Sequence, residues 1–514
     1  MFIRKNKNRS GSISIQVISK QKGRYNLVKS FGAAFNITKI KELEKEAEFF
    51  IAQEEEKNKT QYELFPLEDN DDIAVTEFVK TLGNVNVINI GPELILGKLF
   101  DKIGLGVIPE SLFRHIVLAR LTYPVSKLKT TEYLAQHQKT EVDVSAIYRF
   151  LDRFHKQYKD KVGRIVYEHS QKILQQISVV FYDMTTLYFE TEDEDDLRKI
   201  GFSKDGKFQC PQIMVGLLVG ENGYPIAYDI FEGNTFEGHT ILPVIERTQK
   251  KYNLPKPIIV ADSGLLSKEN IKNLLQKNYE FILGARIKNE TNKIQSEILE
   301  KTKDLKNGES VIIEKPDGTN LIVQFSEKRA KKDAHNRDKG LKKLREKFSS
   351  GKLTKQQVNN RGYNKFLVLE NEIKVSVNEL KIEEDKKWDG LKGYCTNLKL
   401  PAKKIIAHYQ HLWQIEKAFR ISKTDLRVRP IFHRKKDRIE AHLCIAFAAY
   451  AVYKELERQL IINNIEISPA KAIELTKTMY QLTFLLPKSQ KKISQILSPT
   501  FEQQEILKIF RVLQ

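Results

Sequence analysis

The spacing of apolar and polar residues changes along the chain, and each change predicts a different kind of structure. Residues 12–32 alternate on both sides of a Lys-Gly-Arg turn, which predicts two strands, and a charged helix is expected over residues 37–57. Residues 92–177 repeat their apolar positions at helical spacing between short turns, so we expect a compact all-helical unit there. Inside this unit, residues 142–154 form either the second helix of a helix-turn-helix or an ordinary capped helix.

After residue 177 the pattern becomes that of an α/β protein. Strands are predicted from the apolar runs SVVFYD, PQIMVGLLVG, YPIAYDIF, PIIVAD and EFILGAR, with a hairpin turn at Asn222 and Gly223. Helices are predicted over residues 239–252 and from about Ser267 onward. These alternating strands and helices predict an α/β unit built on one sheet.

The last part of the chain changes pattern twice more. The strand signals VIIEK, NLIVQFS and KFLVLE predict a strand-rich insertion, and beyond Pro401 the segment AKKIIAHYQHLWQIEKAFRISK predicts one long helix that opens a helical section. The expected organisation is a small strand and helix module (1–65), a helical unit (66–177), the first part of the α/β core (178–287), the strand-rich insertion (288–400), and the completion of the core with C-terminal helices (401–514).

The charge of the chain points to a nucleic acid partner. There are 86 Lys and Arg residues against 66 Asp and Glu residues, a net charge of +20. Such an excess favours binding to phosphates, although a generally lysine-rich composition would produce the same balance. Residues 328–347 hold ten basic and three acidic residues, so they form either a solvated helix or an arm that faces DNA.

Cysteine content and hydropathy exclude several classes of protein. Cys210, Cys395 and Cys444 are far apart and form no CxxC pair, which argues against a disulfide framework or a cysteine zinc site and suits a reducing cytoplasm. The strongest apolar run, residues 444–453, is too short to cross a bilayer. We therefore expect neither export nor membrane anchoring.

Three carboxylates are candidates for chemistry. Asp183 and Asp262 each end an apolar strand run, where open α/β sheets build their sites, although an Asp there is also an ordinary turn or cap residue. Glu416 falls among apolar neighbours in the middle of the predicted long helix, where an unpaired carboxylate would cost on the order of 2 to 5 kcal/mol unless a metal ion offset it. Tyr409 and Lys423 stand seven residues to either side of Glu416 and share its helix face, a spacing that core packing also produces.

Seven sequence motifs follow one another from about residue 180 to 450: YDMTTLYFE, GFSKDGK, PQIMVGLLV, GNTFEGHT, VADSGLLSKEN, LKGYCTNL and YQHLWQIEKAFRISKTDLRVRPIFHRKKDRIEAHL. In wording and order they resemble the blocks of insertion-sequence DDE transposases of the IS-four superfamily, most of all its long-chain branch. The resemblance implies an α/β fold, namely a ribonuclease H-like mixed sheet flanked by helices. A helical DNA-binding unit would precede this sheet, and the strand-rich insertion would lie between the second Asp and the Glu.

The resemblance also implies the roles of the site residues. Asp183, Asp262 and Glu416 would be the catalytic carboxylates and would hold two Mg²⁺ or Mn²⁺ ions, which oxygen ligands favour over zinc. The family word Y-x2-R-x3-E-x6-K is matched at three positions: Tyr409, Glu416 and Lys423. Leu412 occupies the place of the arginine, and we expect Arg420 or Lys417 to supply the missing phosphate contact.

The activity implied by the resemblance is cut-and-paste DNA transposition by hydrolysis and strand transfer. The implied partners are double-stranded DNA, as terminal inverted repeats and as target, and a second copy of the chain in a homodimer on DNA. The expected location is the bacterial cytoplasm, with the nucleoid and without a membrane. Two alternatives stay open: another ribonuclease H-like nuclease such as a resolvase, and a non-catalytic DNA-binding protein derived from a transposase.

Other polar residues are weaker candidates. The acidic run at residues 192–196 is expected to form a solvated loop, and His408 and His411 lack a third donor at metal-ligand spacing. Four residues of the word GNTFEGHT resemble family positions near the site: Asn234, Thr235, Glu237 and His239.

Overall fold

The computed structural model describes residues 1–8, 10–21, 24–59, 86–204, 206–349, 362–370, 374–485 and 491–509. The chain forms two compact units. The larger unit is Gly91–Lys477, and the smaller unit combines Met1–Ile90 with Thr478–Gln514.

The smaller unit begins with a three-stranded antiparallel sheet. Strands β1 (Phe2–Lys7), β2 (Ile13–Gln21) and β3 (Arg24–Ala34) pair in that order, and helix α1 (Ile37–Lys59) packs its apolar side on them. The two predicted strands are β2 and β3, and β1 is a third strand that the pattern did not indicate. Lys22 and Gly23 of the predicted turn lie outside the described residues.

A second three-stranded sheet in this unit joins distant parts of the chain. Strand β15 (Tyr480–Leu485) pairs with β16 (Lys492–Ile496) on one side and with β4 (Asn86–Asn89) on the other, and helix α16 (Phe501–Ile509) follows. The section after residue 401 was predicted to be helical, and besides its helices it contains this unpredicted hairpin, which completes a sheet whose third strand lies nearly 400 residues earlier.

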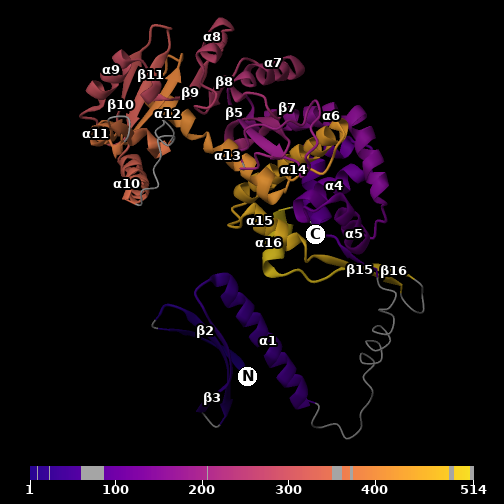
Figure 1. Ribbon diagram of the computed structural model, residues 1–514. Coiled ribbons are helices and arrows are strands. Elements are labelled where there is room, and N and C mark those ends of the chain that lie inside the picture. The colour runs from indigo at the N-terminus through magenta and orange to yellow at the C-terminus, as the bar shows by residue number, and fades with distance from the viewer. Residues whose placement is uncertain are drawn as a thin grey trace. The chain divides into compact units, whose positions relative to one another are not determined.

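The larger unit opens with the predicted helices. They are η3 (Glu93–Gly97), α3 (Lys98–Ile103), η4 (Leu105–Val107), α4 (Ser111–Thr122), α5 (Lys127–Gln138) and α6 (Val144–Leu174). Asp143 caps α6 by accepting a hydrogen bond from the Ser145 amide. The buried face of α6 packs against the long helix α14 (Lys436–Ile462), as Figure 1 shows. Residues 142–154 thus lead into and begin a 31-residue helix that is anchored in the core, rather than forming a short separate helix.

The central sheet has the strand order of a ribonuclease H-like fold. Strands β5 (Val179–Tyr188), β6 (Gln212–Val219) and β7 (Pro225–Glu232) form an antiparallel meander, and β8 (Ile258–Ala261) and β9 (Phe281–Ala285) continue the sheet parallel to β5. The β6–β7 hairpin turns at η5 (Glu221–Gly223), where Asn222 and Gly223 both have positive φ, as predicted.

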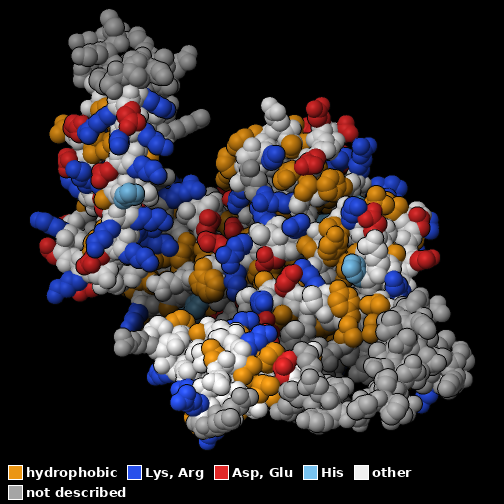
Figure 2. Space-filling view, turned by 90° about the horizontal axis from the view of Figure 1, so that it is seen from below, with side chains coloured by type: hydrophobic (Ala, Val, Ile, Leu, Met, Phe, Trp, Pro, Cys, Tyr) orange, Lys and Arg blue, Asp and Glu red, His pale blue; other side chains and the backbone are white. Residues whose placement is uncertain are grey.

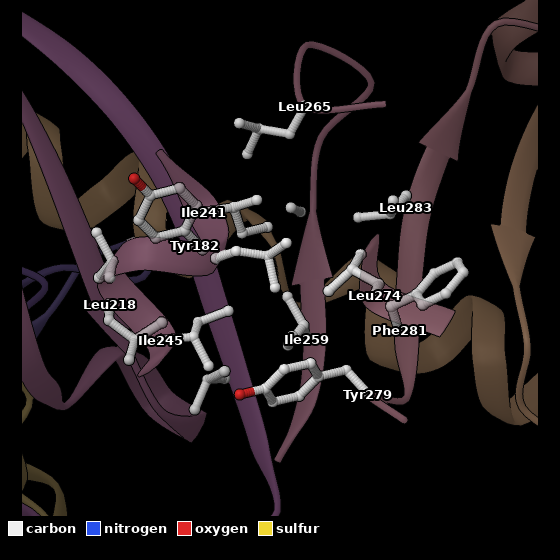
Figure 3. Packing of buried hydrophobic residues seen from close by; sticks show 14 of the residues in the cluster. Tyr182, Leu218, Ile241, Ile245, Ile259, Leu265, Leu274, Tyr279, Phe281 and Leu283 are labelled. Atoms are coloured by element: carbon white, nitrogen blue, oxygen red, sulfur yellow. The ribbon is translucent and has the colours of Figure 1, made fainter. Parts of the chain in front are cut away.

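One face of this sheet is an apolar core covered by two helices. Helices α7 (Ile241–Tyr252) and α8 (Lys268–Gln276) carry Ile241, Ile245 and Leu274 onto Tyr182 and Ile259, as Figure 3 shows. The Ser267 hydroxyl caps α8 by accepting a hydrogen bond from Asn270 N. Because side chains alternate along a strand, the residues next to Tyr182 and Ala261 project to the opposite face.

The insertion extends the central sheet instead of standing apart from it. Strands β14 (Leu391–Thr396), β11 (Asn320–Phe325) and β10 (Ser310–Glu314) add to the edge at β9 and bring the sheet to eight strands. Outside the sheet the insertion has further elements: η7 (Ile287–Asn289), α9 (Asn292–Thr302), α10 (Glu327–Ser349), η9 (Gly362–Phe366), β12 (Leu367–Glu370), β13 (Lys374–Val377) and α11 (Glu379–Lys386). Residues 328–347 lie in α10, whose Leu341 and Leu344 join a small apolar core.

The segment after Pro401 is three helical pieces rather than the single helix that was predicted. They are α12 (Ala402–Gln410), α13 (Trp413–Arg420) and the π-helix η10 (Ile421–Asp425), and they lead into α14 and α15 (Pro469–Thr476). The hydrogen bonds from Gln414 N to His411 O and from Ile415 N to Leu412 O span three residues instead of four. They interrupt the α-helix between α12 and α13. No helix among the described residues combines the length and apolarity needed to cross a membrane.

Candidate active site

Asp183 and Asp262 lie side by side on neighbouring parallel strands. Tyr182 of β5 is in register with Ala261 of β8, so the next residues of the two strands, Asp183 and Asp262, stand at the same level. Both project away from the core that holds Tyr182 and Ala261. Asp262 follows the end of β8 as predicted, whereas Asp183 lies in the middle of β5, which runs on to Tyr188 because β6 continues to pair with it.

Several charged side chains surround the partly buried Asp183 carboxylate. Burial, together with the negative charges of Asp262 and Glu237, raises the pKa of Asp183 to about 6, against the lowering influence of Lys204. The Lys204 ammonium lies 3.8 Å from Asp183 Oδ1 and 2.7 Å from Glu237 Oε1. It also donates to the Met184 carbonyl at 2.7 Å. A single ammonium therefore bridges two carboxylates beside the strand pair.

Lys204 is a site residue that sequence reasoning did not single out, and Glu237 was only a weak candidate. Lys204 lies in the motif GFSKDGK, and Glu237 lies in GNTFEGHT. Glu237 lies in a short 3-10 helix, Glu237–His239, and a methyl group built on Gly264 would lie 3.1 Å from its Oε2 and 2.9 Å from Asp262 Oδ1. Those two carboxylates therefore flank the same glycine. The residue spacing within GFSKDGK and GNTFEGHT did not predict that these side chains lie together.

The phenol of Tyr409 is influenced by the charges of all three candidate carboxylates, including Glu416. The negative charges of Asp262, Glu416 and Asp183 all raise the pKa of this buried phenol, in addition to the larger effect of burial itself. Its hydroxyl lies over Gly284 of β9, where a Cβ would be 2.4 Å from Tyr409 Oη and 2.9 Å from Ser263 N. Only a glycine at that position lets the phenol approach the strand end that carries Asp262.

Glu416 has a different environment from the one predicted. It is exposed and lies in the first turn of α13, which packs against β5, so the expectation of a buried unpaired carboxylate is wrong. Its apolar neighbours Leu412 and Ile415 are buried because they occupy the other side of the helix. A carboxylate in a first helical turn is favoured by the positive end of the helix dipole.

The basic residues predicted around Glu416 separate into two groups. Lys423 lies in η10 and lines a small pocket with Thr185 and Leu187, the residues that follow Asp183 along β5. Arg420 is exposed at the end of α13. Lys417 points elsewhere, since it forms an ion pair with Glu457 of α14.

Leu412, in the arginine's place, is only 7% exposed. A buried leucine there offers no phosphate contact, so the side chains that remain for such contacts come from other elements.

The weaker candidates lie in varied places. The acidic run at residues 192–196 is a mostly exposed loop, as expected, and its Asp195 pairs with Arg198 at 2.7 Å. Asn234, His239 and His411 are exposed, Thr235 is half-buried, and His408 is half-buried on α12. None of these histidines joins a metal-type cluster within the described parts of the chain.

A basic cleft opens next to Tyr409. It has a volume of about 800 Å³ and runs between the paired strands β9 and β14 and helix α10. Six basic and three acidic residues line it: Arg286, Lys288, Arg329, Arg337, Lys365 and Lys392, and Asp333, Asp385 and Asp389. Figure 2 shows Lys and Arg side chains crowded along the insertion, which forms the arm at the left of that view.

The donor set suits a hard divalent cation, although the described residues include no ready-made group of three ligands. Aspartate and glutamate oxygens are the ligands that Mg²⁺ and Mn²⁺ prefer. Burial and, to a smaller extent, the charges of Asp262 and Glu237 raise the pKa of Asp183, and Lys204 offsets this rise only in part. Two adjacent strand-borne carboxylates, with Glu416 on the helix that packs over them, fit such an ion.

Comparison with known proteins gives a family match. The sequence matches the family described as "Transposase DDE domain" over residues 174–452. None of the curated proteins matches it. Among solved structures, a piggyBac transposase synaptic complex with hairpin DNA is 12% identical, with a TM-score of 0.37 over 75% of this chain and 76% of that chain. A Mos1 transposase paired-end complex with left transposon end is 13% identical, with a TM-score of 0.16 over 36% of this chain and 56% of that chain.

Proposed function

The chain belongs to the family of transposases with a DDE domain, and from that premise we propose that it cuts and joins DNA as the transposase of an insertion sequence. The finer placement, in the long-chain branch of the IS-four superfamily, rests on the order of its sequence words. The enzyme would bind the terminal inverted repeats, hydrolyse a phosphodiester to release a 3′-hydroxyl, and transfer that end to target DNA.

One observation carries the catalytic assignment. Asp183 and Asp262 are adjacent on two parallel strands in register, and Tyr409 lies within the electrostatic reach of both and of Glu416. We assign these three carboxylates as the catalytic set. Strand ends of an α/β sheet, with a helix packed across them, are a common location for such sites.

Asp183, Asp262 and Glu416 would hold the Mg²⁺ or Mn²⁺ ions, two for each site. When bound, such ions stabilise the attacking and leaving oxygens of a phosphodiester. Lys204 bridges Asp183 and Glu237 and thereby orients both carboxylates. The partial neutralisation by Lys204 lowers the repulsion that two adjacent aspartates would otherwise feel.

The DNA would follow the basic surfaces beside this site. We assign phosphate contacts to Tyr409, Lys423 and Arg420, and further contacts to the basic cleft below α10. Lys417 is a weaker candidate for a phosphate contact because Glu457 already neutralises its charge. The helical residues 92–177 and the insertion would contact the terminal repeats, and a homodimer would bring two ends together at the bacterial nucleoid in the cytoplasm.

The test is a cleavage and joining assay with the full chain. A labelled duplex that carries the element's end is incubated with Mg²⁺ and a target plasmid, and DNA binding is measured in parallel. Asp183→Asn, Asp262→Asn and Glu416→Gln should each lose cleavage but keep DNA binding. The matched control Asp304→Asn, at an exposed turn, should keep both activities.

Each alternative has its own outcome in this assay. A wild-type chain that binds the end without cutting it contradicts the enzyme assignment and favours a DNA-binding protein. Cleavage without strand transfer favours a resolvase-type nuclease. If Glu416→Gln keeps full activity while both aspartate variants lose it, the third carboxylate is misassigned.

A further inference from the structure

A second basic cavity lies in the larger unit, away from the three carboxylates. Its volume is about 250 Å³, and it is bounded by α4, α5, the start of α6, the loop after η10 and the start of α14. Four of its lining side chains are cationic: Arg120, Lys127, Arg427 and Arg429. None of its lining residues is acidic. The cavity therefore concentrates positive charge in a partly enclosed space.

Lys127 is the most unusual of these cations. It is only 8% exposed and lines the cavity from the first turn of α5. Its side-chain ammonium makes no hydrogen bond or ion pair with any residue that the structure describes. Burial and the nearby charge of Arg120 both lower the pKa of Lys127. An ammonium buried without a partner is costly, and an anion in the cavity would offset that cost.

The other buried polar groups do not balance this charge. Arg120 Nη1 donates to the carbonyls of Leu426 and Arg427, at 3.2 and 3.1 Å, and its Nη2 lies 3.3 Å from His442 Nδ1. His442 Nε2 in turn lies 3.1 Å from the Val428 carbonyl. Burial lowers the pKa of His442 and holds that of His433 at about 3, so both rings are neutral. The Arg120 guanidinium therefore donates to the loop that contains Leu426 and Arg427. None of these groups balances the positive charge of Lys127.

The cavity also faces the N-terminus of α5, a helix of 12 residues capped by Ser126. The free amides and the dipole at a helix N-terminus favour an anion such as phosphate. The N-terminus of α5, the buried ammonium of Lys127 and the two loop arginines therefore all favour an anionic ligand.

We propose that this cavity binds a phosphate group, and that the group belongs to a DNA backbone. The loop that forms one wall is tied to the catalytic strand, since Ile431 N donates to the Tyr188 carbonyl at 3.3 Å. Tyr188 lies five residues after Asp183 on β5, roughly 16 Å along the strand at about 3.3 Å per residue. One DNA molecule can span that distance. The inference concerns binding alone and does not depend on the cleavage chemistry.

The experiment compares Lys127→Met with Lys129→Met in the full chain. Lys129 is the matched control, because it lies in the same helical turn but is exposed and paired with Glu132 at 2.8 Å. Arg427→Gln, an exposed residue of the cavity wall, gives a second test that does not alter the buried core. Binding of a short duplex is measured against salt concentration in EDTA, and thermal unfolding is measured with and without inorganic phosphate.

Losing one phosphate contact should reduce the slope of log affinity against log salt by about 1. We expect this reduction for Lys127→Met and Arg427→Gln but not for Lys129→Met, together with a loss of stabilisation by inorganic phosphate. Loss of the phosphate effect with an unchanged DNA slope would mean that the ligand is a free phosphate compound. If neither measurement separates the cavity variants from Lys129→Met, the proposal is overturned. A wild type that binds no DNA would refute the proposed function, while the phosphate measurement would still decide the cavity.

Discussion

Replacing Asp183 by asparagine should stabilise the metal-free protein at neutral pH. Burial and two neighbouring carboxylates raise the pKa of Asp183 from 3.8 to about 6. Each pKa unit corresponds to about 1.4 kcal/mol, so the ionised side chain costs the folded state about 3 kcal/mol. The side chain is 21% exposed, so solvent screening removes little of this cost. Asparagine keeps the acceptor for the Met184 amide, 2.7 Å away, and carries no charge.

The pH dependence of this effect has a definite sign. Between pH 3.8 and about 6 the folded chain holds a proton on Asp183 that the unfolded chain has lost, so the contribution to stability falls as pH rises through that window. The advantage of Asp183→Asn should therefore be near zero below pH 4. It should reach its full size above pH 7.

Urea unfolding in EDTA, followed by tryptophan fluorescence, measures this difference. The two tryptophans, Trp388 beside the basic cleft and Trp413 in α13, report on the region around the site. Asp304→Asn, which removes an exposed carboxylate, is the control and should change stability by less than about 0.5 kcal/mol. Added Mg²⁺ should stabilise the wild type more than Asp183→Asn. A variant that is less stable than the wild type at pH 8, or a difference that does not shrink toward pH 4, would refute the electrostatic reasoning.

Three further predictions concern the neighbours of this aspartate. Gly284→Ala should cost about 1 to 3 kcal/mol of stability by overpacking and abolish cleavage, because its Cβ would meet the Tyr409 hydroxyl at 2.4 Å, and pairing it with Tyr409→Phe should recover part of the stability in urea unfolding. Glu416→Gln should change the free energy of unfolding by less than about 1 kcal/mol while abolishing cleavage, since the side chain is exposed; a larger loss would mean that it is structural. Lys204→Met should raise the pKa of Asp183 further by removing its nearest cation, so the low-pH limb of the cleavage rate should move to higher pH, and an unmoved limb would contradict the assignment.

Several local features of the fold were predictable because they depend on near neighbours in the chain. The apolar runs predicted β5 to β9, the Asn-Gly pair predicted the β6–β7 hairpin, and Ser267 marked the start of α8. In each case a strand period, a turn conformation or a capping hydroxyl acts over a few residues. The order of the sequence motifs also predicted a DDE transposase, and the comparison confirmed that family.

Features that depend on pairing between distant segments were missed or misplaced. The insertion was predicted as strand-rich, but the pattern did not indicate that its strand β14 pairs with β9 and extends the central sheet. The C-terminal hairpin pairs with β4, which no local pattern could indicate. An open sheet edge accepts any strand of suitable length and pattern, so the choice of partner is made by the whole fold.

Glu416 shows how burial differs from apolar neighbours in the sequence. Leu412 and Ile415 flank it and are buried, yet Glu416 itself is exposed at the start of α13. Consecutive helical residues are about 100° apart, so the side that faces the core is decided by where the helix packs. The break after Gln410 and the π-helix from Ile421 add rotations that ideal seven-residue spacing does not include.

The sequence by itself determined strands β5 to β9 of the central sheet, the family of DDE transposases, and three candidate carboxylates, because local backbone preference, apolar period and motif wording are all written along the chain. Only the tertiary structure decided that Asp183 and Asp262 share a level, that Lys204 bridges Asp183 and Glu237, and that Lys127 is buried without a partner. Those facts depend on strand register and on which faces meet. They link residues tens to hundreds of positions apart, where no local physical preference acts.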